Sequence, residues 1–590
     1  MPGSYSVRTL FMRRFLLGIA SVLCLVACSP SPSHQSSTIR IRWPRDPENL
    51  DPLVAPNSHA VEILNLLHCS LLSIDYNQKE FVPWLVEAMP VVRQRDSLTL
   101  VTYQLRSEAS WDNGLPVLAS DVVFTLKVMN CPGLPNEASR AQYGFIQNIE
   151  PDPADERRFT LSFRGRAREL VHSSGDYPIL PEHQLDPQKH LRRVSLAALR
   201  ADTVPNKRRQ QPDITAFVQR YQRANLNRQP ENLAGCGPYR LVDWQTDRYV
   251  ALQRKANWWG DRVKAAPPQL QAKPAAIDYE IIADEATAVL ALRRGDIDIY
   301  PMMPAKDFLA LRQNKAATQL SFYTADSYEM IAAGFNTRQP ELQDARTRQA
   351  LSYLFDIPGL IQASQQGMAY PSVSLVSPAA GESYHDSLPL LTFNTQRAQD
   401  LLRSAGWQQQ AQGWTRRVAN GTLQHLKPSI SYRAGNPAYE AIALQFRTAA
   451  AKIGIPVQPR PTEASLFTEH LRTGNVELYL QLLSGNPFTY NFTPILHSQS
   501  IGWGNFTGFG TAASDQLIEA IATEGDPKRQ AHLLRKFQYL LRQECPLVVL
   551  YFLQYRLAAT NRLTNLHATG IRPGYEAAAI QSLPAGTIQP

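Results

Sequence analysis

The chain has 590 residues, of which 44% are hydrophobic and 19% charged, and its formal net charge is +9. This length exceeds what one hydrophobic core supports, so we expect two or three domains. The composition excludes a disordered chain. Basic residues gather between 192 and 228, with Phe217 and Tyr221 as aromatic neighbours. A nucleic-acid groove needs more interleaved aromatics, so we interpret this stretch as a solvated basic loop and predict no nucleic-acid partner.

Residues 1–28 have the pattern of a secretory signal. Three arginines precede an apolar run of about 13 residues, whereas a membrane-spanning helix needs about 20. The run ends in Leu25-Val26-Ala27-Cys28, which resembles a bacterial lipobox, where the cysteine thiol is acylated. We therefore predict lipid attachment at Cys28, with several acyl chains for stable anchoring. The alternative is an ordinary cleaved signal that happens to contain a cysteine.

The first half of the remaining chain alternates strands with helices. Alternation of apolar and polar residues predicts strands over 39–43, 99–105 and 159–163, and the loop 44–52 follows the first of them. The spacing of apolar residues predicts a helix over 59–72. Ser120-Asp121 is expected to cap a second helix over 122–129.

The middle of the chain contains a long weakly periodic stretch. We interpret residues 186–232 as an inserted loop with helical pieces. Residues 235–254 then predict strand, turn and strand. A helix over 286–294 is expected to end at Gly295, a C-cap position, before a strand over 297–300.

The second half again mixes helices and strands, which predicts an α/β protein. Strands are expected over 429–433, 457–459 and 548–552. Helices are expected over 344–355, 357–367, 395–404, 438–453, 465–472, 514–523 and 527–544.

Chemical motifs are scarce. Outside the first 28 residues the cysteines are Cys69, Cys131, Cys236 and Cys545, with no CxxC pair and no Cys/His cluster, so we predict no structural metal. One or two disulfides among these cysteines are an open alternative, because the spacing of the cysteines does not assign pairs. The sequence contains no G-x-S-x-G, H-E-x-x-H, P-loop or dinucleotide-binding motif. We predict that the protein is not an enzyme and uses no cofactor.

Five blocks occur in a recognisable order over some 500 residues. They are Glu48–Pro52, Thr102–Phe124, Gly235–Gly260, Arg294–Asp298 and Phe335–Leu351. Together they resemble the family 5 extracellular solute-binding proteins, which bind oligopeptides, dipeptides or nickel for ABC importers. The glycines of the third block, Gly235 and Gly237, are expected where the backbone of another segment approaches closely.

The resemblance implies an α/β fold of the periplasmic-binding-protein type II. In such a fold two lobes close on a ligand about a hinge, and this family adds an inserted domain. Mapped onto this chain, lobe one comprises 29–57, 185–325 and 546–590. The insert comprises 58–184, and the far lobe comprises 326–545.

The resemblance also implies ligand contacts from two segments. The loop after the first strand would contribute Arg45, Asp46, Glu48 and Asn49. The matching far-lobe segment would contribute Gln481, Leu483, Asn486 and Tyr490. Peptide-binding relatives carry an Arg, a Trp and an Asp there, and the Asp pairs with the peptide amine; residues 478–487 contain none of these. Because leaving a buried ammonium unpaired costs about 3–5 kcal/mol, the peptide amine needs another partner, or the ligand is different.

The resemblance implies a monomeric receptor in the periplasm or cell envelope, lipid-anchored to a bacterial membrane, with ABC permease and ATPase partners. Its expected ligand is a peptide or a related small solute. Alternatives are a sugar, another non-peptide solute, or a metal chelate, for which His497 is the candidate ligand. A surface hydrolase built on the same scaffold is a further alternative, because fold does not fix function.

Overall fold

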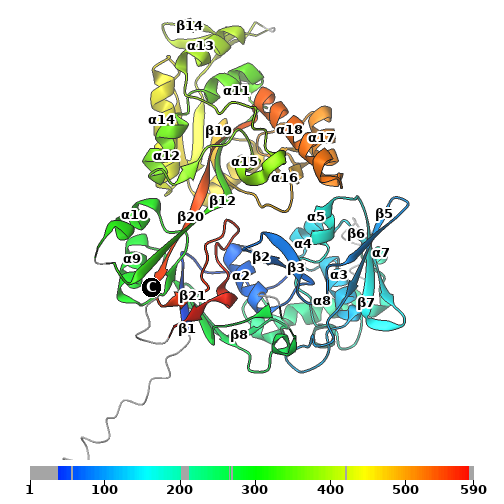
Figure 1. Ribbon diagram of the computed structural model, residues 1–590. Coiled ribbons are helices and arrows are strands. Elements are labelled where there is room, and N and C mark those ends of the chain that lie inside the picture. Colours follow the sequence, from blue (N-terminus) through cyan, green and yellow to red (C-terminus); the bar gives the residue numbers. More distant parts are fainter. Residues whose placement is uncertain are drawn as a thin grey trace, which may run out of the picture.

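The computed structural model describes residues 38–583, except 55–56, 201–211, 265, 267–269, 316 and 419–420. The predicted lipid-attachment site Cys28 lies outside these residues. Within them the chain forms two lobes, stacked one above the other in Figure 1, with a smaller β-sheet unit beside the lower lobe. No helix in the described part of the chain is long and apolar enough to cross a membrane.

One mixed sheet of eleven strands runs through both lobes. Its order is β18-β17-β19-β12-β20-β11-β1-β10-β9-β8, with β13 beside β20. The strands of the lower lobe are β1 (Thr38–Trp43), β8 (Tyr239–Gln245), β9 (Tyr249–Arg254), β10 (Ala276–Ile281) and β11 (Ile299–Tyr300). The strands of the upper lobe are β13 (Ala369–Tyr370), β17 (Ser429–Arg433), β18 (Gln458–Thr462) and β19 (Leu478–Ser484).

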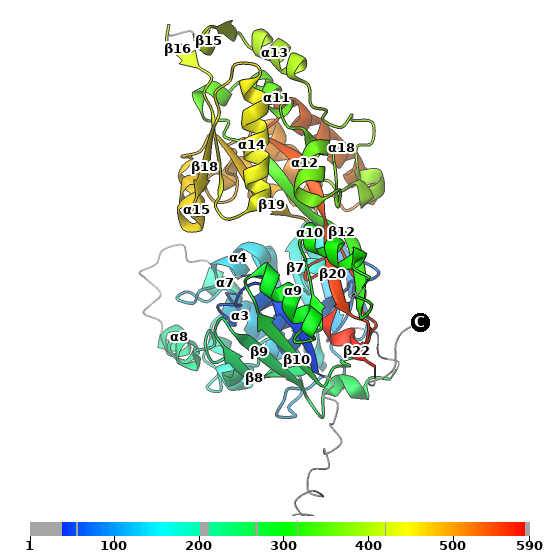
Figure 2. The ribbon, with the colours of Figure 1, turned by 90° about the vertical axis from the view of Figure 1, so that its left-hand side faces the viewer.

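Two long antiparallel strands, β12 (Leu320–Phe335) and β20 (Leu547–Thr560), carry the sheet from one lobe to the other. Their lower parts pair from Leu320 to Asp326 of β12, and their upper parts pair from Met330 onward. The pairing register shifts between Asp326 and Met330. Figure 2 shows both strands at the junction of the lobes, so this irregularity lies where the sheet changes lobe.

The lower lobe packs around β1 and β10, whose Trp43 and Tyr279 rings stack 4.0 Å apart. Helix α2 (Ser58–Leu67) lies at the top of this lobe, facing the upper one (Figure 1). Helices α9 (Glu285–Arg294) and α10 (Ala305–Gln313) form a satellite core through Leu292 and Phe308. The hairpin β2 (Leu72–Asp75) and β3 (Glu80–Pro83) follows α2, and the pair β21 (Leu563–Thr564) and β22 (Gln581–Ser582) lies near the C-terminus.

The smaller unit beside the lower lobe is a four-stranded sheet with the order β4-β5-β7-β6. Its strands are β4 (Val91–Arg95), β5 (Leu98–Gln104), β6 (Ile146–Asp152) and β7 (Asp155–Arg164). Its hydrophobic residues belong to the same buried core as those of the lower lobe. The accompanying helices are α3 (Ala119–Met129), α4 (Glu137–Tyr143), α5 (Arg168–Ser173), α6 (Glu182–Leu185), α7 (Leu196–Arg200) and α8 (Pro212–Ala224).

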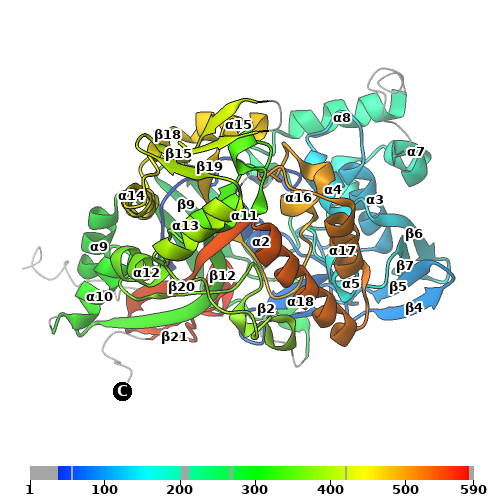
Figure 3. The same cartoon turned by 90° about the horizontal axis from the view of Figure 1, so that it is seen from above.

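The upper lobe has separate cores of its own, in which Phe355 stacks on Phe446 at 4.6 Å. Viewed from above, its helices surround and partly cover the long strands β12 and β20 (Figure 3). They are α11 (Ala345–Ser352), α12 (Ile357–Gln365), α13 (Thr395–Ser404), α14 (Pro437–Ala451), α15 (Ala464–Thr473), α16 (Thr493–Leu496), α17 (Ala512–Thr523) and α18 (Pro527–Glu544). A small sheet is formed by β14 (Gln408–Gln410), β15 (Gly413–Arg417) and β16 (Leu423–His425).

Most predicted elements are present, several of them with shifted ends, and two helix predictions were wrong in detail. The helix expected over 59–72 ends at Leu67, because Cys69 and Leu72 bond through their backbones to residues 179 and 175. The helix expected at 122 begins at Ala119 after Leu118, so Asp121 is not its cap. Asp121 instead lies in the first turn, where its carboxylate accepts the Leu118 N–H at 3.0 Å.

The two glycines of the third block stand where the prediction placed a close backbone approach. A Cβ atom at Gly237 would lie 2.4 Å from the carbonyl oxygen of Leu66, and one at Gly235 would lie 2.0 Å from that of Leu67. The C-terminus of α2 therefore fits against this loop only when both residues lack side chains. Cys236 stands between these glycines, and the four described cysteines are free thiols.

Candidate functional site: the junction of the two lobes

An ion pair at the junction of the lobes links segments that are far apart in sequence. The Arg572 Nε atom lies 2.5 Å from Oε1 of Glu329, which is on β12 beside the register shift. The same carboxylate oxygen accepts from the Ser484 hydroxyl at the end of β19, at 3.2 Å. Arg572 also donates to the Ser58 hydroxyl at the start of α2, at 2.9 Å. We call Glu329 and Arg572 the hinge ion pair.

The hinge ion pair is buried on its acidic side. Glu329 is 2% exposed, and its second oxygen, Oε2, has no hydrogen-bond partner among the described residues. Burial opposes the charge of Arg572, but the Glu329 carboxylate outweighs this effect and raises the pKa of Arg572 above its usual value. The junction therefore holds a fixed pair of opposite charges, with one carboxylate oxygen unused.

The loop after β1 packs against the start of α2, where the Asn57 side chain donates to the Asp46 and Pro47 carbonyls. Asp46 is buried, and its carboxylate accepts the backbone N–H of Glu48 at 2.7 Å, the Trp244 indole N–H at 3.0 Å and the Asp247 N–H at 3.0 Å. Asn49 accepts the Asp51 N–H at 2.8 Å. Asp46 and Asn49 thus hold the shape of the loop, whereas Arg45 and Glu48 are exposed at its surface.

Positive charge gathers near the start of α2. His59 packs on the Trp43 ring at 4.7 Å. Burial, and after it the nearby charges of Arg45, Arg572 and Arg42, together lower the pKa of His59 from 6.5 to about 4. His59 is therefore neutral at pH 7, and the positive charge here belongs to the arginines.

The predicted far-lobe residues lie around a second cavity. A cavity of about 140 Å³ is lined by Leu483, Asn486 and Tyr490, together with Tyr328 of β12. The Asn486 side-chain oxygen accepts the backbone N–H groups of Phe488 and Thr489, at 2.8 and 2.9 Å, so it shapes its own turn. Gln481 is on β19, paired with Ala332, and does not line this cavity.

The β2–β3 hairpin and the smaller β-sheet unit border the same junction. Phe81 of β3 makes an edge contact with Phe488 of the upper lobe, with ring centroids 4.8 Å apart. The Lys79 ammonium lies over the Tyr328 ring at 5.6 Å. Gln530 of α18 donates to the Glu169 carboxylate of α5 at 2.8 Å. The junction is thus enclosed from the lower lobe, the upper lobe and the smaller unit.

Sequence reasoning missed Glu329, Arg572 and Ser484. The available signal was an acidic residue inside the otherwise buried run at the end of β12, since a charged residue in a buried strand usually has a partner. The partner Arg572 is 243 positions away, and no motif announces it.

His497, the candidate metal ligand, has a structural role. Its Nδ1 atom accepts the Gln499 N–H at 3.1 Å, and its Nε2 atom lies 3.3 Å from the Glu519 carboxylate. Across the described residues no group of three His, Cys, Asp or Glu side chains is arranged to hold a metal ion.

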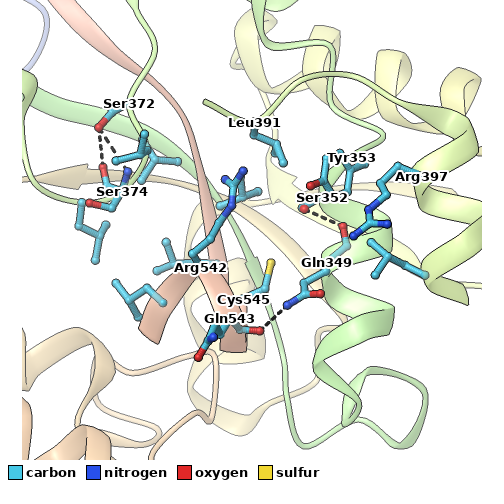
Figure 4. A pocket seen from close by; sticks show the side chains of 17 residues that line it. Gln349, Ser352, Tyr353, Ser372, Ser374, Leu391, Arg397, Arg542, Gln543 and Cys545 are labelled. Atoms are coloured by element: carbon cyan, nitrogen blue, oxygen red, sulfur yellow. Dashed lines mark hydrogen bonds between the residues drawn. The ribbon is translucent and has the colours of Figure 1, made fainter. Parts of the chain in front are cut away.

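A further cavity of about 200 Å³ lies inside the upper lobe (Figure 4). Its polar side chains bond to neighbouring backbone: Gln349 donates to the Gln543 carbonyl at 2.5 Å, and Ser372 donates to the carbonyls of Ser374 and Val376. None of its lining residues belongs to the junction of the lobes, so we do not assign it to the site.

Comparison with known proteins gives a consistent result. The profile described as "Bacterial extracellular solute-binding proteins, family 5 Middle" matches residues 80–503. The dipeptide-binding protein of Escherichia coli is 20% identical over 540 residues, covering 90% of this chain and 91% of that protein.

Two solved structures show the same fold at low identity. The oligopeptide-binding protein of Bacillus subtilis, in complex with a nonapeptide, matches with a TM-score of 0.70 and 19% identity, covering 93% of this chain and 99% of that one. A periplasmic EDTA-binding protein matches with a TM-score of 0.75 and 17% identity, covering 93% and 97%. The predicted α/β fold of the periplasmic-binding-protein type II is thereby confirmed.

Proposed function

The chain belongs to the bacterial extracellular solute-binding proteins of family 5, and from this premise we propose that it captures a peptide or related small solute between its lobes and delivers it to an ABC permease. The observation that carries the proposal is the junction itself. Side chains from both lobes converge on Glu329, beside the register shift between β12 and β20. One carboxylate oxygen of Glu329 accepts hydrogen bonds from them, and the other has no partner among the described residues. A solute held there contacts both lobes and favours their closure.

We propose that the site includes Arg45, Glu48, Leu483, Asn486 and Tyr490, together with Glu329 and Arg572. Arg45 and Glu48 are exposed on the loop after β1, and Leu483, Asn486 and Tyr490 line one cavity. Asp46 and Asn49 support the loop through backbone hydrogen bonds, so we give them a positioning role. We place Gln481 at the rim of the site, because it does not line the cavity.

We propose the lobe boundaries given by the sequence, with two changes. The register shift between Asp326 and Met330 supports a boundary near residue 326. The separate buried cores of residues 330–552 support extending the far lobe from 326–545 to include the first half of β20. Helix α2 fits lobe one better than the insert, because its Glu62 accepts hydroxyl hydrogen bonds from Tyr279 and Tyr575.

We propose that the protein is non-catalytic, acts as a monomer, and is held to the cell envelope through lipid on Cys28. The family of solute-binding proteins supports the first point. The apolar run before Cys28 supports the last. Metabolic labelling with a palmitate analogue should mark the wild-type protein and not Cys28→Ala. Labelling of both proteins alike would contradict the anchor.

A metal chelate is a second candidate. Arg45 and Arg572 both act on His59, so they bring two positive charges to the start of α2, and a chelate that carries carboxylates would match them. The far-lobe segment 478–487 contains no acidic residue that would repel the carboxylates of such a chelate.

The test is native mass spectrometry of the mature protein purified under mild conditions, followed by calorimetry with the identified solute after refolding from denaturant. We expect a bound peptide or small solute, a Kd in the range of about 1 nM to 1 μM, and a smaller radius of gyration on rebinding. A protein that carries nothing and stays open with peptide, sugar and chelate libraries would contradict the proposal.

A further inference from the structure

A cavity of about 230 Å³ lies between α2, the β2–β3 hairpin and residues 572–578. Its lining includes two carboxyl groups and three aromatic rings: Glu62, Glu576, Tyr76, Trp84 and Tyr575. We call it the acid–aromatic cavity. Ser58 and Arg572 also line it, and both belong to the contacts of the hinge ion pair, so the cavity adjoins the junction of the lobes.

The two carboxyl groups have no cationic partner in the described part of the chain. Glu62 accepts the hydroxyl groups of Tyr575 at 2.7 Å and Tyr279 at 3.1 Å, which are neutral donors. Glu576 forms no ion pair with any described residue, and the cation of the lining, Arg572, is bonded to Glu329. Burial raises the pKa of each of the two glutamates to about 7, as is expected for carboxyl groups without compensation.

Trp84 gives an independent sign of a missing partner. Its side chain lines the cavity and is 6% exposed, yet the indole Nε1–H has no acceptor among the described residues. Buried indole N–H groups normally find an acceptor. The cavity therefore combines an unused donor with two carboxyl groups that lack a cation.

A ligand that satisfies all these groups has a definite chemistry. A protonated amine supplies N–H donors and positive charge to the carboxylates, and aromatic rings favour a cation at their faces. An oxygen atom close to that amine supplies the acceptor that Trp84 needs. The volume is below the range of about 300–1,000 Å³ for complete ligand pockets, so the cavity suits one terminal group of a larger solute.

We infer that the acid–aromatic cavity is the subsite for a protonated primary amine of the solute, with a carbonyl oxygen next to it received by Trp84. This inference rests on the proposed function. It assigns the amine to lobe one, where Glu62 and Glu576 pair with it. Residues 478–487 of the far lobe contain no acidic residue that could do so. The remainder of the solute then extends past Arg572 toward the hinge.

The test uses L-alaninamide, which carries an ammonium and an adjacent carbonyl, and lactamide, which replaces the ammonium by a hydroxyl. Both are titrated into the ligand-free full-length mature protein at pH 8, followed by saturation-transfer NMR and calorimetry. We expect L-alaninamide to bind at least about tenfold more tightly than lactamide, because hydrogen bonds to charged groups are worth about that factor or more.

Isosteric variants locate the binding. Glu576→Gln and Glu62→Gln should each weaken L-alaninamide binding by at least about fivefold, and Trp84→Phe should weaken both probes alike. Glu469→Gln, which changes an exposed acid on α15, is the matched control and should bind like wild type. Circular dichroism and a thermal melt confirm that each variant is folded.

Equal binding of the two probes, no binding of either, or no effect of both glutamate variants would overturn the inference. These outcomes differ from a failure of the proposed function. A solute that co-purifies, rebinds and closes the lobes with unchanged affinity in Glu62→Gln and Glu576→Gln leaves the receptor function intact and removes only the amine subsite.

Discussion

At the level of residues, the contribution of the hinge ion pair to the free energy of unfolding can be tested directly. Glu329→Gln leaves the half-buried Arg572 guanidinium without its counter-charge. We expect the free energy of unfolding to fall by about 1–3 kcal/mol, below the value of about 3–5 kcal/mol for fully buried pairs, because 36% of the Arg572 side chain is exposed and solvent screens it. Urea unfolding at pH 7 measures the change.

The matched control is Asp400→Asn, which breaks the exposed pair of Asp400 with Arg403. That change should cost less than about 0.5 kcal/mol. Equal costs for the two variants would mean that Glu329 contributes no more than a surface charge.

Glu62 makes stability depend on pH. Burial raises its pKa from 4.5 to about 7 in the folded protein, so the folded state holds a proton that the unfolded state has released. Stability is therefore greatest below about pH 4.5, falls as the pH rises to about 7, and is level above that, with a total change of up to about 3 kcal/mol. Glu62→Gln should be more stable than wild type at pH 8 and equal to it near pH 4.5.

Denaturant unfolding of both proteins at several pH values gives the difference curve, which separates Glu62 from other titrating groups. A flat curve for Glu62→Gln would refute a raised pKa in the folded state.

Part of the candidate site was accessible from the sequence. The loop at 45–49 and the segment at 483–490 were predicted from the family resemblance, and Leu483, Asn486 and Tyr490 do share one cavity. The hinge ion pair was not predicted, because its members are 243 positions apart and neither lies in a motif. The same holds for Glu62, Trp84 and Glu576, which only the packing of α2 brings together.

At the level of elements, the contact of α2 with the loop before β8 depends on an absent side chain. Gly237→Ala would place a Cβ atom 2.4 Å from the Leu66 carbonyl oxygen, so backbone must move. We expect a loss of about 2–4 kcal/mol, in the range of overpacking and strain. Gly114→Ala is the control: its φ of +81° is unfavourable for alanine, but its Cβ would meet nothing within 4 Å, so about 1 kcal/mol is expected.

Thermal unfolding with calorimetry compares the two variants. A Gly237→Ala protein as stable as Gly114→Ala would show that the loop can shift freely.

Helices with clear start and stop residues were predicted well, since α13 and α18 agree with the sequence at both ends. The long strand β12 was not predicted. Its second half, Met330–Phe335, is buried on both faces and so lacks the alternation that marks a half-exposed strand. The overlong helix at 59–72 has the same kind of cause, because its end is set by pairing with residues 175–179 rather than by a local stop.

At the level of the whole molecule, the contact of Phe81 with Phe488 joins the β2–β3 hairpin to the upper lobe. Phe488→Ala should shift the lobes toward an open arrangement and raise the Kd of the co-purified solute by about 2–10-fold, since aromatic pairs contribute about 0.5–1.5 kcal/mol. Small-angle scattering of the ligand-free protein should show a larger radius of gyration. Phe393→Ala, at an exposed position of the upper lobe, is the control.

An unchanged radius of gyration together with an unchanged Kd would show that the contact has no part in closure. A changed Kd with an unchanged radius would point to a direct contact between Phe488 and the solute instead.

The path of the crossing strands also bears on the order of assembly. Strand β12 is made long before β20, which lies within the last 44 residues and is the neighbour of β12 on one side and of β11 on the other. Until β20 emerges from the ribosome or the translocation channel, β12 and β11 each lack a neighbour on the side where β20 will pair, and such a bare edge is a template for wrong pairing. A chain truncated before residue 547 should therefore aggregate rather than leave one lobe intact, so the pairing of β20 acts as the closing step for the large sheet.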